Sequence, residues 1–282
     1  MKTFWEITKF RLVLLVLWTT VVGYLWGSRG PFDSFMLLRA LIGTAFVAAG
    51  SMALNQYLER ESDAQMKRTQ NRPLPSRRIK PRQALLLGIF LSIIGILELA
   101  FAVNLLCASL ALLTLITYLF IYTPLKKKTP LCTLIGAIPG ALPPMIGWAA
   151  ARGGLGAGAW ILFAILFFWQ IPHFFAIAWI YREDYAKAGF RMLSVVDPTG
   201  QRIGREIMIY TLGVHLLSLV PAVLGMMSPT YYLGALLLGI WFIASSFRTA
   251  FQLDARSRSF FKSSVLYLAF LFLLMILDKR PI

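Results

Sequence analysis

The sequence predicts an all-α integral membrane protein with about nine transmembrane helices, forming a single domain over residues 1–282. Three observations lead to this fold class. Hydrophobic residues make up 58% of the chain and its mean hydropathy is +0.70, so the apolar share exceeds that of ordinary globular proteins. Charged residues are only 14% of the total and fall in clusters. Between the clusters, apolar stretches of roughly 17–25 residues are long enough to cross about 30 Å of hydrocarbon as helices.

The apolar stretches are predicted, in chain order, near residues 10–27, 35–56, 84–101, 103–122, 131–150, 159–181, 206–226, 230–248 and 261–277. The third and fourth stretches are nearly continuous. One uninterrupted helix of about 38 residues would be about 57 Å long, which is far more than the bilayer needs. We therefore expect a turn between them at Val103 and Asn104.

The first apolar stretch, Leu12 to Trp26, follows the basic residues Lys2, Lys9 and Arg11, an arrangement that a signal peptide would also show. It lacks a clean small-x-small cleavage site and is followed by further apolar stretches. We interpret it as a retained first span. No Arg-rich, Ser-rich organellar presequence precedes it, so we expect a bacterial plasma (inner) membrane protein.

The formal net charge of +16 and the pI of 10.2 are also typical of nucleic-acid-binding proteins. The distribution of the charge favours a membrane protein instead. Of the 28 Lys and Arg residues, all fall on alternate loops except Arg29, Arg39, Arg152, Lys279 and Arg280. Loops rich in Lys and Arg remain on the cytoplasmic side of a membrane. We therefore expect no nucleic-acid partner, a cytoplasmic N-terminus and, with nine spans, a C-terminus outside.

Two spans carry irregular residues. The fifth contains Pro139, Pro143 and Pro144, and the sixth contains Pro172. Such breaks are tolerated in a membrane where the freed backbone groups find partners or line a cavity. The two cysteines of the chain lie in or beside apolar spans without a CxxC pattern, and we interpret them as small buried apolar residues.

The first long polar loop, about residues 57–83, begins with a stack of oxygen ligands. Asn55, Glu59 and Asp63 are four residues apart, so they lie on one face if the second helix continues past the lipid boundary. Mg²⁺ takes one or two carboxylates together with waters and phosphate oxygens. The basic residues Lys67, Arg68 and Arg72, which are suited to phosphate, follow at once. The pattern predicts a diphosphate site; the alternative is a basic topology signal with a few solvated acids.

The second polar loop, about residues 182–205, carries a similar set. Glu183 and Asp184 lie just past the sixth span, and Lys187 and Arg191 follow closely. Because both loops face the same side, the two sets could hold two Mg²⁺ ions around one diphosphate and neutralise it as a leaving group. The alternative is a group of ordinary solvated residues after a helix end.

Four motifs in order resemble the UbiA superfamily of intramembrane prenyltransferases. They are NxxxExxxDxxMxRTxxRPLP from Asn55, YTPLKKKTPLCTLIGAIPGALPPMIGW from Tyr122, WQIPHFFAIAW from Trp169 and DYAKAGFRML from Asp184. Together they cover about residues 55–193. Within the superfamily they resemble the branch that farnesylates haem. The resemblance implies a UbiA-type helical bundle with a central cavity, and Mg²⁺-dependent transfer of a farnesyl group from farnesyl diphosphate to a vinyl group of haem B.

The resemblance also implies roles for individual residues. The expected metal ligands are Asn55, Glu59, Asp63, Glu183 and Asp184, of which Asn55, Asp63 and Asp184 are the expected catalytic residues; the expected diphosphate ligands are Lys67, Arg68, Arg72, Lys126 and Lys187. Two departures from the family pattern stand out. Glu59 replaces an expected aspartate and is longer by one methylene, and Phe190, Arg191 and Ser194 stand where the family has prolines. Haem A synthase or a terminal oxidase would be the protein partner.

His173 is one of two histidines and lies beside Pro172 near the cytoplasmic end of the sixth span. An ionisable group at membrane depth is costly and is often functional. With haem as the implied substrate, His173 is a candidate for axial ligation or for contact with a propionate; the alternative is a hydrogen-bonded packing residue. His215 has no motif around it, and we interpret it as a packing residue.

The expected chemistry is electrophilic. Metal and cations loosen the diphosphate, the allylic carbon gains positive charge, the vinyl group attacks it, and water then adds. No nucleophilic side chain is needed. Two alternatives remain: prenylation of a quinone precursor by the same fold, and a secondary transporter, which would also have broken helices and intramembrane polar groups. A transporter should bury charges near the midplane, whereas here nearly every acid except Glu98 lies at a span end or in a loop.

Overall fold

The computed structural model describes residues 2–29 and 31–278, and the regular secondary structure of this part is helical. Nine helical segments in these residues are long and apolar enough to cross a membrane. The predicted fold class, an all-α multi-pass membrane protein, is therefore confirmed. Lys279, Arg280 and Ile282, which contributed to the predicted orientation, lie outside the described residues.

The first half of the chain forms five spans. Its helices are α1 (Lys2–Ile7), α2 (Phe10–Gly27), α3 (Ser34–Gln65), α4 (Pro81–Ala102), α5 (Leu105–Ile116), the π-helical η1 (Thr117–Tyr122), α6 (Thr123–Leu125), α7 (Cys132–Ala141) and α8 (Pro143–Arg152). The predicted turn at Val103 and Asn104 is confirmed, and the Asn104 side chain caps α5 by accepting a bond from the Cys107 amide. The proline-rich fifth span is broken into α7 and α8 at Leu142.

The second half forms four spans and two short helices in the loop between α9 and α12. Its helices are α9 (Ala157–Ile180), α10 (Arg182–Lys187), α11 (Leu193–Val196), α12 (Gln201–Val223), α13 (Pro229–Phe251) and α14 (Leu253–Leu277). Helix α9 runs through Pro172 without ending. Hydropathy predicted later starts for α12 and α14 and an earlier end for α3, because it detects only the hydrocarbon-spanning part of a helix. The helices themselves continue into the polar region.

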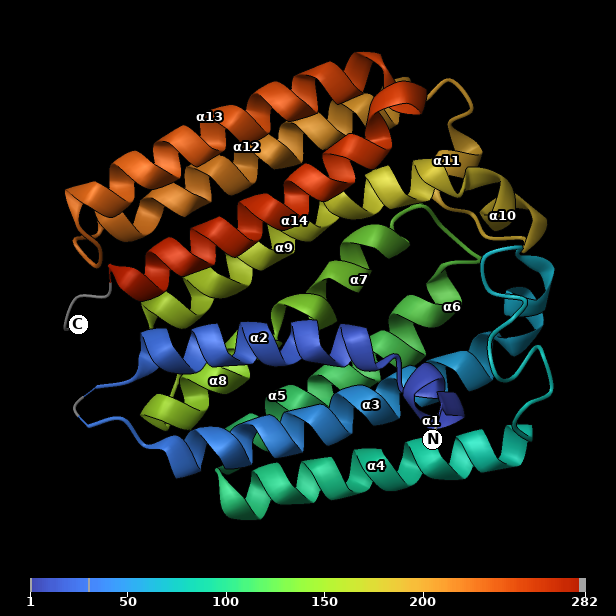
Figure 1. Cartoon of the computed structure of the whole chain (residues 1–282), viewed down its shortest axis with the longest axis horizontal. Coiled ribbons are helices and arrows are strands. Elements are labelled where there is room, and N and C mark those ends of the chain that lie inside the picture. Colours follow the sequence, from blue (N-terminus) through green and yellow to red (C-terminus); the bar gives the residue numbers. More distant parts are fainter. Residues whose placement is uncertain (1, 30, 279–282) are drawn as a thin grey trace.

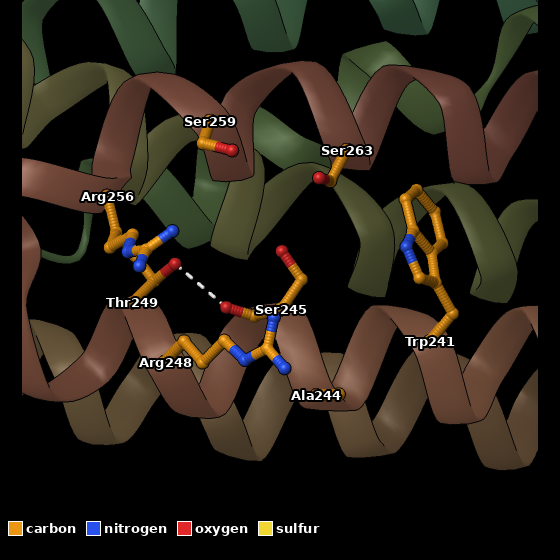
Figure 2. A pocket seen from close by; sticks show the side chains of 8 residues that line it. All are labelled: Trp241, Ala244, Ser245, Arg248, Thr249, Arg256, Ser259 and Ser263. Atoms are coloured by element: carbon orange, nitrogen blue, oxygen red, sulfur yellow. Dashed lines mark hydrogen bonds between the residues drawn. The ribbon is translucent and has the colours of Figure 1, made fainter.

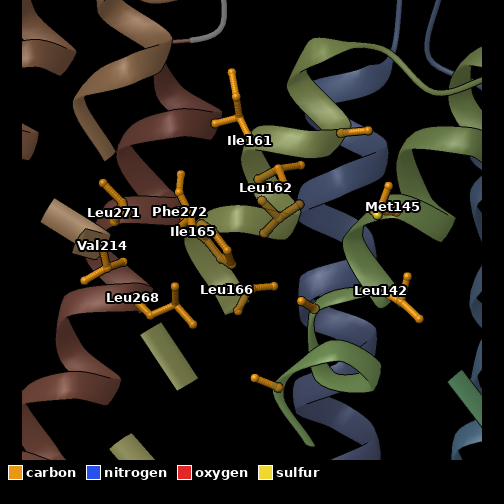
Figure 3. Packing of buried hydrophobic residues seen from close by; sticks show 14 of the residues in the cluster. Leu142, Met145, Ile161, Leu162, Ile165, Leu166, Val214, Leu268, Leu271 and Phe272 are labelled. Atoms are coloured by element: carbon orange, nitrogen blue, oxygen red, sulfur yellow. The ribbon is translucent and has the colours of Figure 1, made fainter. Parts of the chain in front are cut away.

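The helices form two groups with α9 between them. Figure 1 shows α2, α3, α4, α5 and α8 on one side, and α12, α13 and α14 on the other. The apolar core extends across this boundary: Figure 3 shows Ile165 and Leu166 of α9 between Leu142 and Met145 on one side and Leu268 on the other. Because lipid tails are as apolar as these side chains, close packing and not hydrophobic transfer holds the groups together.

The polar loops gather at one end of the bundle. Figure 1 shows α1, the segment between α3 and α4, α10 and α11 at this end, while the connections from α2 to α3 and from α12 to α13 lie at the other. Helix α1 is fixed there by two contacts. The Gln56 side chain donates to the carbonyls of Glu6 and Ile7, and Arg78 forms an ion pair with Glu6. The two predicted motif loops are therefore neighbours in space.

Helices α2 and α8 approach so closely that glycine is required at their contact. A Cβ atom added at Gly147 would collide with the Thr20 carbonyl oxygen, and one at Gly23 would collide with the Pro144 carbonyl oxygen. Backbone atoms cannot rotate away as a flexible side chain can. Small residues at such contacts are characteristic of membrane helix packing.

We predict that Gly147→Ala destabilises the protein by about 1–3 kcal/mol, because overpacking forces two backbones apart. Gly154→Ala is the matched control, since a Cβ there meets nothing within 4 Å. The measurement is the midpoint of thermal unfolding of both purified variants in the same detergent. Equal midpoints for the two variants would contradict the packing argument.

Candidate functional site

Three polar side chains line one buried face at the end of α3. Asn55, Glu59 and Asp63 are 1%, 8% and 1% exposed, and their four-residue spacing aligns them along the helix. They align because α3 stays helical to Gln65. The predicted alignment depended on this continuation of the helix. A carboxylate is buried this deeply only when it is paired or bound to a metal. The basic partners are therefore part of the site.

Each member of this face has a basic partner, and the partners of Asn55 and Glu59 come from distant parts of the chain. Lys126 Nζ lies 2.7 Å from Glu59 Oε1, and Arg72 bonds both Asp63 carboxylate oxygens at 2.7 Å. Lys9 Nζ donates to Asn55 Oδ1 at 3.1 Å. The three oxygen donors and the three basic residues thus alternate in one cluster at the polar-loop end of the bundle. We call this end the mouth.

The pKa values of the two lysines differ because their partners differ. Burial is the main cause that lowers the pKa of Lys9 to about 7, and the Arg72 guanidinium acts in the same direction; its direct partner Asn55 is neutral. Burial by itself also lowers the pKa of Lys126. There the Glu59 carboxylate outweighs burial and holds the pKa well above its usual range. Among the described residues, the face therefore holds the Glu59–Lys126 ion pair beside a lysine, Lys9, whose direct partner is the neutral Asn55 side chain.

Asp184 joins the second loop to the first. Its carboxylate accepts bonds from the backbone amides of Lys67 and Arg68, both at 3.2 Å, and the residue is buried. The Arg68 guanidinium lies over the Tyr181 ring, 4.6 Å from its centroid, and donates to the Tyr185 hydroxyl. Helix α10 thereby orders the turn that carries the basic residues, and it directs the exposed Arg68 side chain across the mouth.

Other predicted residues are not gathered into the cluster. Glu183 and Lys187 are exposed, and in the described ranges 2–29 and 31–278 neither side chain has a hydrogen bond or ion pair. The Lys67 side chain is also exposed; only its backbone amide contacts Asp184. Arg191 contributes its amide, which donates to the Lys126 carbonyl at 2.7 Å.

Lys9 is a site residue that the sequence reasoning missed. With Lys2 and Arg11 it was interpreted only as a topology signal before the first span. The backbone at Lys9 is left-handed, with φ of 49°, and it turns the chain between α1 and α2. That turn directs the lysine side chain at Asn55. A left-handed lysine is costly, and nothing in the local sequence marks it.

His173 lies on α9 in an aromatic setting of its own. Its Nδ1 is 2.8 Å from the Ser264 hydroxyl, and its ring stacks on Trp169 with 4.8 Å between centroids. Phe261 lies against it at the same centroid distance. These contacts fix the ring through Nδ1. His215 packs against Gly239, where a Cβ would collide with it, in agreement with a packing role.

The oxygen donors fit a hard divalent cation that shares its ligands with a diphosphate. Among the described residues, no group of three or more His, Cys, Asp and Glu side chains converges as a complete protein cage. Mg²⁺ does not need one, because it is held by one or two carboxylates plus waters and substrate oxygens. Asn55, Glu59 and Asp63 are such a donor set, and their cations are suited to the same diphosphate.

A cavity of about 280 Å³ opens beside this face, between α3 and the η1–α6 segment. Its polar lining includes Glu59, Ser62, Thr123 and Lys127, and its apolar lining includes Leu119 and Phe120. The π-helical turn of η1 is a rare geometry that often occurs at functional sites. The cavity places an apolar wall next to the charged cluster, as an amphiphilic substrate requires.

Residues 16–274 match the UbiA prenyltransferase family. The chain belongs to this family. It is 48% identical to a protoheme IX farnesyltransferase of Solibacter usitatus over 99% of both chains. It is 42% identical to a protoheme IX farnesyltransferase of Koribacter versatilis, covering 99% of this chain and 94% of that one.

Solved structures agree with the fold. A structure of digeranylgeranylglyceryl phosphate synthase superposes with a TM-score of 0.82 at 19% identity, covering 98% of this chain and 97% of that one. A UbiA homologue from Archaeoglobus fulgidus, bound to DMAPP and Mg²⁺, superposes with a TM-score of 0.70 at 18% identity, covering 97% and 99%. At these identities the likeness establishes the shared helical architecture.

We predict that Asp184→Ala speeds amide hydrogen exchange in residues 66–72, because the Lys67 and Arg68 amides lose their acceptor. Glu183→Ala is the matched control, since Glu183 is the residue next to Asp184 and its side chain is exposed. Hydrogen-exchange mass spectrometry of both variants provides the measurement. Faster exchange in both variants, or in neither, would show that Asp184 does not order this turn.

Proposed function

We propose that this chain transfers a farnesyl group from farnesyl diphosphate to a vinyl group of haem B, forming haem O. The observation that carries the reaction class is the buried cluster on α3, in which two carboxylates and an amide are interleaved with Lys9, Arg72 and Lys126. The identity of the acceptor is supported by the near-full-length relatives named protoheme IX farnesyltransferase. Prenylation of a quinone precursor has no comparable support.

The basic residues of the mouth recognise the diphosphate. Lys9 has no carboxylate of its own, and Arg68 is held over Tyr181 with its guanidinium exposed. Both cations can turn to an incoming anion without breaking a buried ion pair. Arg72 and Lys126 already pair with Asp63 and Glu59, so they would hold these carboxylates in place while sharing donors with phosphate oxygens.

Mg²⁺ bound through Asn55, Glu59, Asp63 and the diphosphate oxygens would neutralise the charge of the leaving group. The carbon–oxygen bond of the farnesyl diphosphate then breaks with both electrons on the diphosphate. The vinyl group supplies the electron pair for the new carbon–carbon bond. Water adds to the resulting cationic carbon next to the porphyrin and loses its proton to solvent. The chain binds, orients and shields these partners.

His173 is the proposed contact to haem. The Ser264 hydroxyl engages Nδ1, so Nε2 is the nitrogen left to meet iron or a propionate. Trp169 and Phe261 keep the ring in this orientation and add an apolar, aromatic surface suited to a porphyrin. A haem held here would approach from the α9–α14 side, apart from the charged mouth on α3.

We also propose that the protein resides in a bacterial inner membrane with its charged mouth facing the cytoplasm. The basic loops gather at that end of the bundle, as the positive-inside rule requires of the cytoplasmic side. Farnesyl diphosphate, a soluble-headed amphiphile, would enter from there. Haem O would pass to a membrane partner such as haem A synthase or a terminal oxidase.

The test of the proposed function is the haem extracted from cells that express the chain in a host without haem O synthase. Chromatography with mass detection should show farnesylated haem. Asp63→Asn should remove most of it while leaving the protein inserted and abundant, because a buried ligand loses its charge. Glu61→Gln is the control, since Glu61 is 79% exposed two residues away. A normal amount of farnesylated haem from the Asp63→Asn variant would contradict the ligand assignment.

The two substrates should respond to different residues. Arg68→Ala should weaken use of farnesyl diphosphate roughly tenfold to hundredfold, the loss of one charge-assisted bond, with haem binding unchanged; Arg82→Ala, an exposed charge at the start of α4, is its control. His173→Ala should alter the haem absorption spectrum or haem affinity and leave diphosphate use near normal. An unchanged spectrum and turnover would return His173 to a packing role.

Membrane orientation can be measured with reporter fusions that are active only in the periplasm. A fusion after Ile282 should be active, and a fusion at Arg77 should be silent, because Arg77 lies in the basic segment between α3 and α4. The reverse pattern would invert the proposed topology and would place the diphosphate mouth on the wrong side of the membrane.

A further inference from the structure

A second polar cavity lies away from the α3 cluster, between α13 and α14. Its volume is about 250 Å³. Figure 2 shows Ser245 of α13 and Ser259 and Ser263 of α14 pointing into the space between the two helices. Arg256 lies at one end of this space, and the guanidinium of Arg248 lies beside Ser245. Trp241 lines the other end of the cavity.

The cavity carries positive charge without a counter-charge. Over residues 2–29 and 31–278, neither Arg248 nor Arg256 forms an ion pair; Arg256 contacts only the neutral Gln252 side chain, at 3.4 Å. The neighbouring acid, Asp254, is engaged elsewhere, by Arg182 at 2.9 Å and by the Trp179 indole. Two arginines that line one cavity and are not paired with a carboxylate among the described residues form a site for an anion.

Hydroxyl groups extend the site beyond the two charges. In the described part of the chain, the side-chain hydroxyls of Ser245, Ser259 and Ser263 have no hydrogen-bond partner. They come from both helices and face the same space. A phosphate group takes several donors at once, and two guanidinium groups with three hydroxyls supply them.

The depth of the cavity in the membrane indicates what kind of anion fits. The apolar part of α13 ends near Arg248, so the guanidinium groups lie at the polar boundary. Trp241 is seven residues earlier, about 10 Å further along the helix axis, and it is 42% exposed on the lipid-facing surface. An occupant therefore needs a phosphate at one end and hydrocarbon at the other.

We propose that this cavity binds an anionic membrane phospholipid, with the phosphate at Arg248 and Arg256 and an acyl chain along Trp241. A basic pocket between transmembrane helices at the cytoplasmic boundary is the usual form of such a site. Free phosphate would satisfy the arginines and would leave Trp241 without a partner. The farnesyl diphosphate site proposed above lies on the other helix group, so the two sites are separate.

The experiment uses the full-length protein in phosphatidylcholine nanodiscs that contain a small fraction of photoactivatable phosphatidylglycerol. Cross-linked peptides are mapped by mass spectrometry. Wild-type protein should cross-link within residues 241–263. The double variant Arg248→Ala, Arg256→Ala should reduce cross-linking there at least tenfold, since two charge-assisted contacts are lost. Arg258→Ala is the matched control. Arg258 lies in the same helical turn as Arg256, but it does not line the cavity.

Ser263→Leu gives an independent test, because it fills the cavity and keeps both charges. It should also reduce cross-linking within residues 241–263, so the proposal stays testable if the double variant does not fold. Unlabelled phosphatidylglycerol should compete, and inorganic phosphate at the same concentration should not. Three outcomes overturn the proposal: equal competition by phosphate, which indicates a simple anion site; stronger competition by farnesyl diphosphate; and an equal loss in Arg258→Ala.

Discussion

Glu59 and Lys126 form a buried ion pair, with 2.7 Å between Oε1 and Nζ, and the polar end of the molecule is organised around it. The two residues are 67 positions apart in sequence. Removing one partner of such a pair leaves an uncompensated buried charge, which costs several kcal/mol. The pair therefore ties the end of α3 to the end of α6, and it limits where the other cations of the cluster can lie.

The local geometry around this pair follows from the same constraint. The π-helical turn of η1 shifts the helical phase before α6, and the Tyr118 carbonyl accepts bonds from both the backbone amide and the hydroxyl of Thr123. Thr123 also accepts a bond from Asn55, so the same hydroxyl fixes the amide of the neighbouring ligand. The Tyr122 ring covers the Lys126 ammonium, 4.5 Å away. A rare backbone geometry is stabilised here by the polar contacts it permits.

Much of the fold was predictable from the sequence because the bilayer imposes a length and an apolar composition on every span. The nine spans of the described residues and the turn at Asn104 follow from that rule, and the break in the fifth span follows from its prolines. The ends of α3, α12 and α14 were not predictable in the same way, since a helix continues beyond the lipid wherever capping and tertiary contacts support it. At α14 the support is Asp254, which holds Arg182 and Trp179.

The site was predictable only as far as local spacing reaches. Four-residue spacing aligned Asn55, Glu59 and Asp63, and it did so correctly because α3 remains helical. Spacing could not identify Lys9 as the partner of Asn55, because that contact depends on a left-handed residue 46 positions earlier. Spacing also could not distinguish Glu183 from Asp184. The helical phase of α10 buries Asp184 and leaves Glu183 exposed.

The bundle has a charged environment at one end and an aromatic environment in its interior, because a buried charge in a membrane needs a polar partner. Buried carboxylates gather around the end of α3, where Glu59 and Asp63 pair with cations and Asp184 accepts bonds from backbone amides. The interior near α9 uses aromatic rings and a single histidine, whose partner is the neutral Ser264. A diphosphate cannot be stabilised in the second environment, and a porphyrin has no need of the first. Under the proposed function, the two substrates would meet where these environments adjoin, toward the polar-loop end of the bundle.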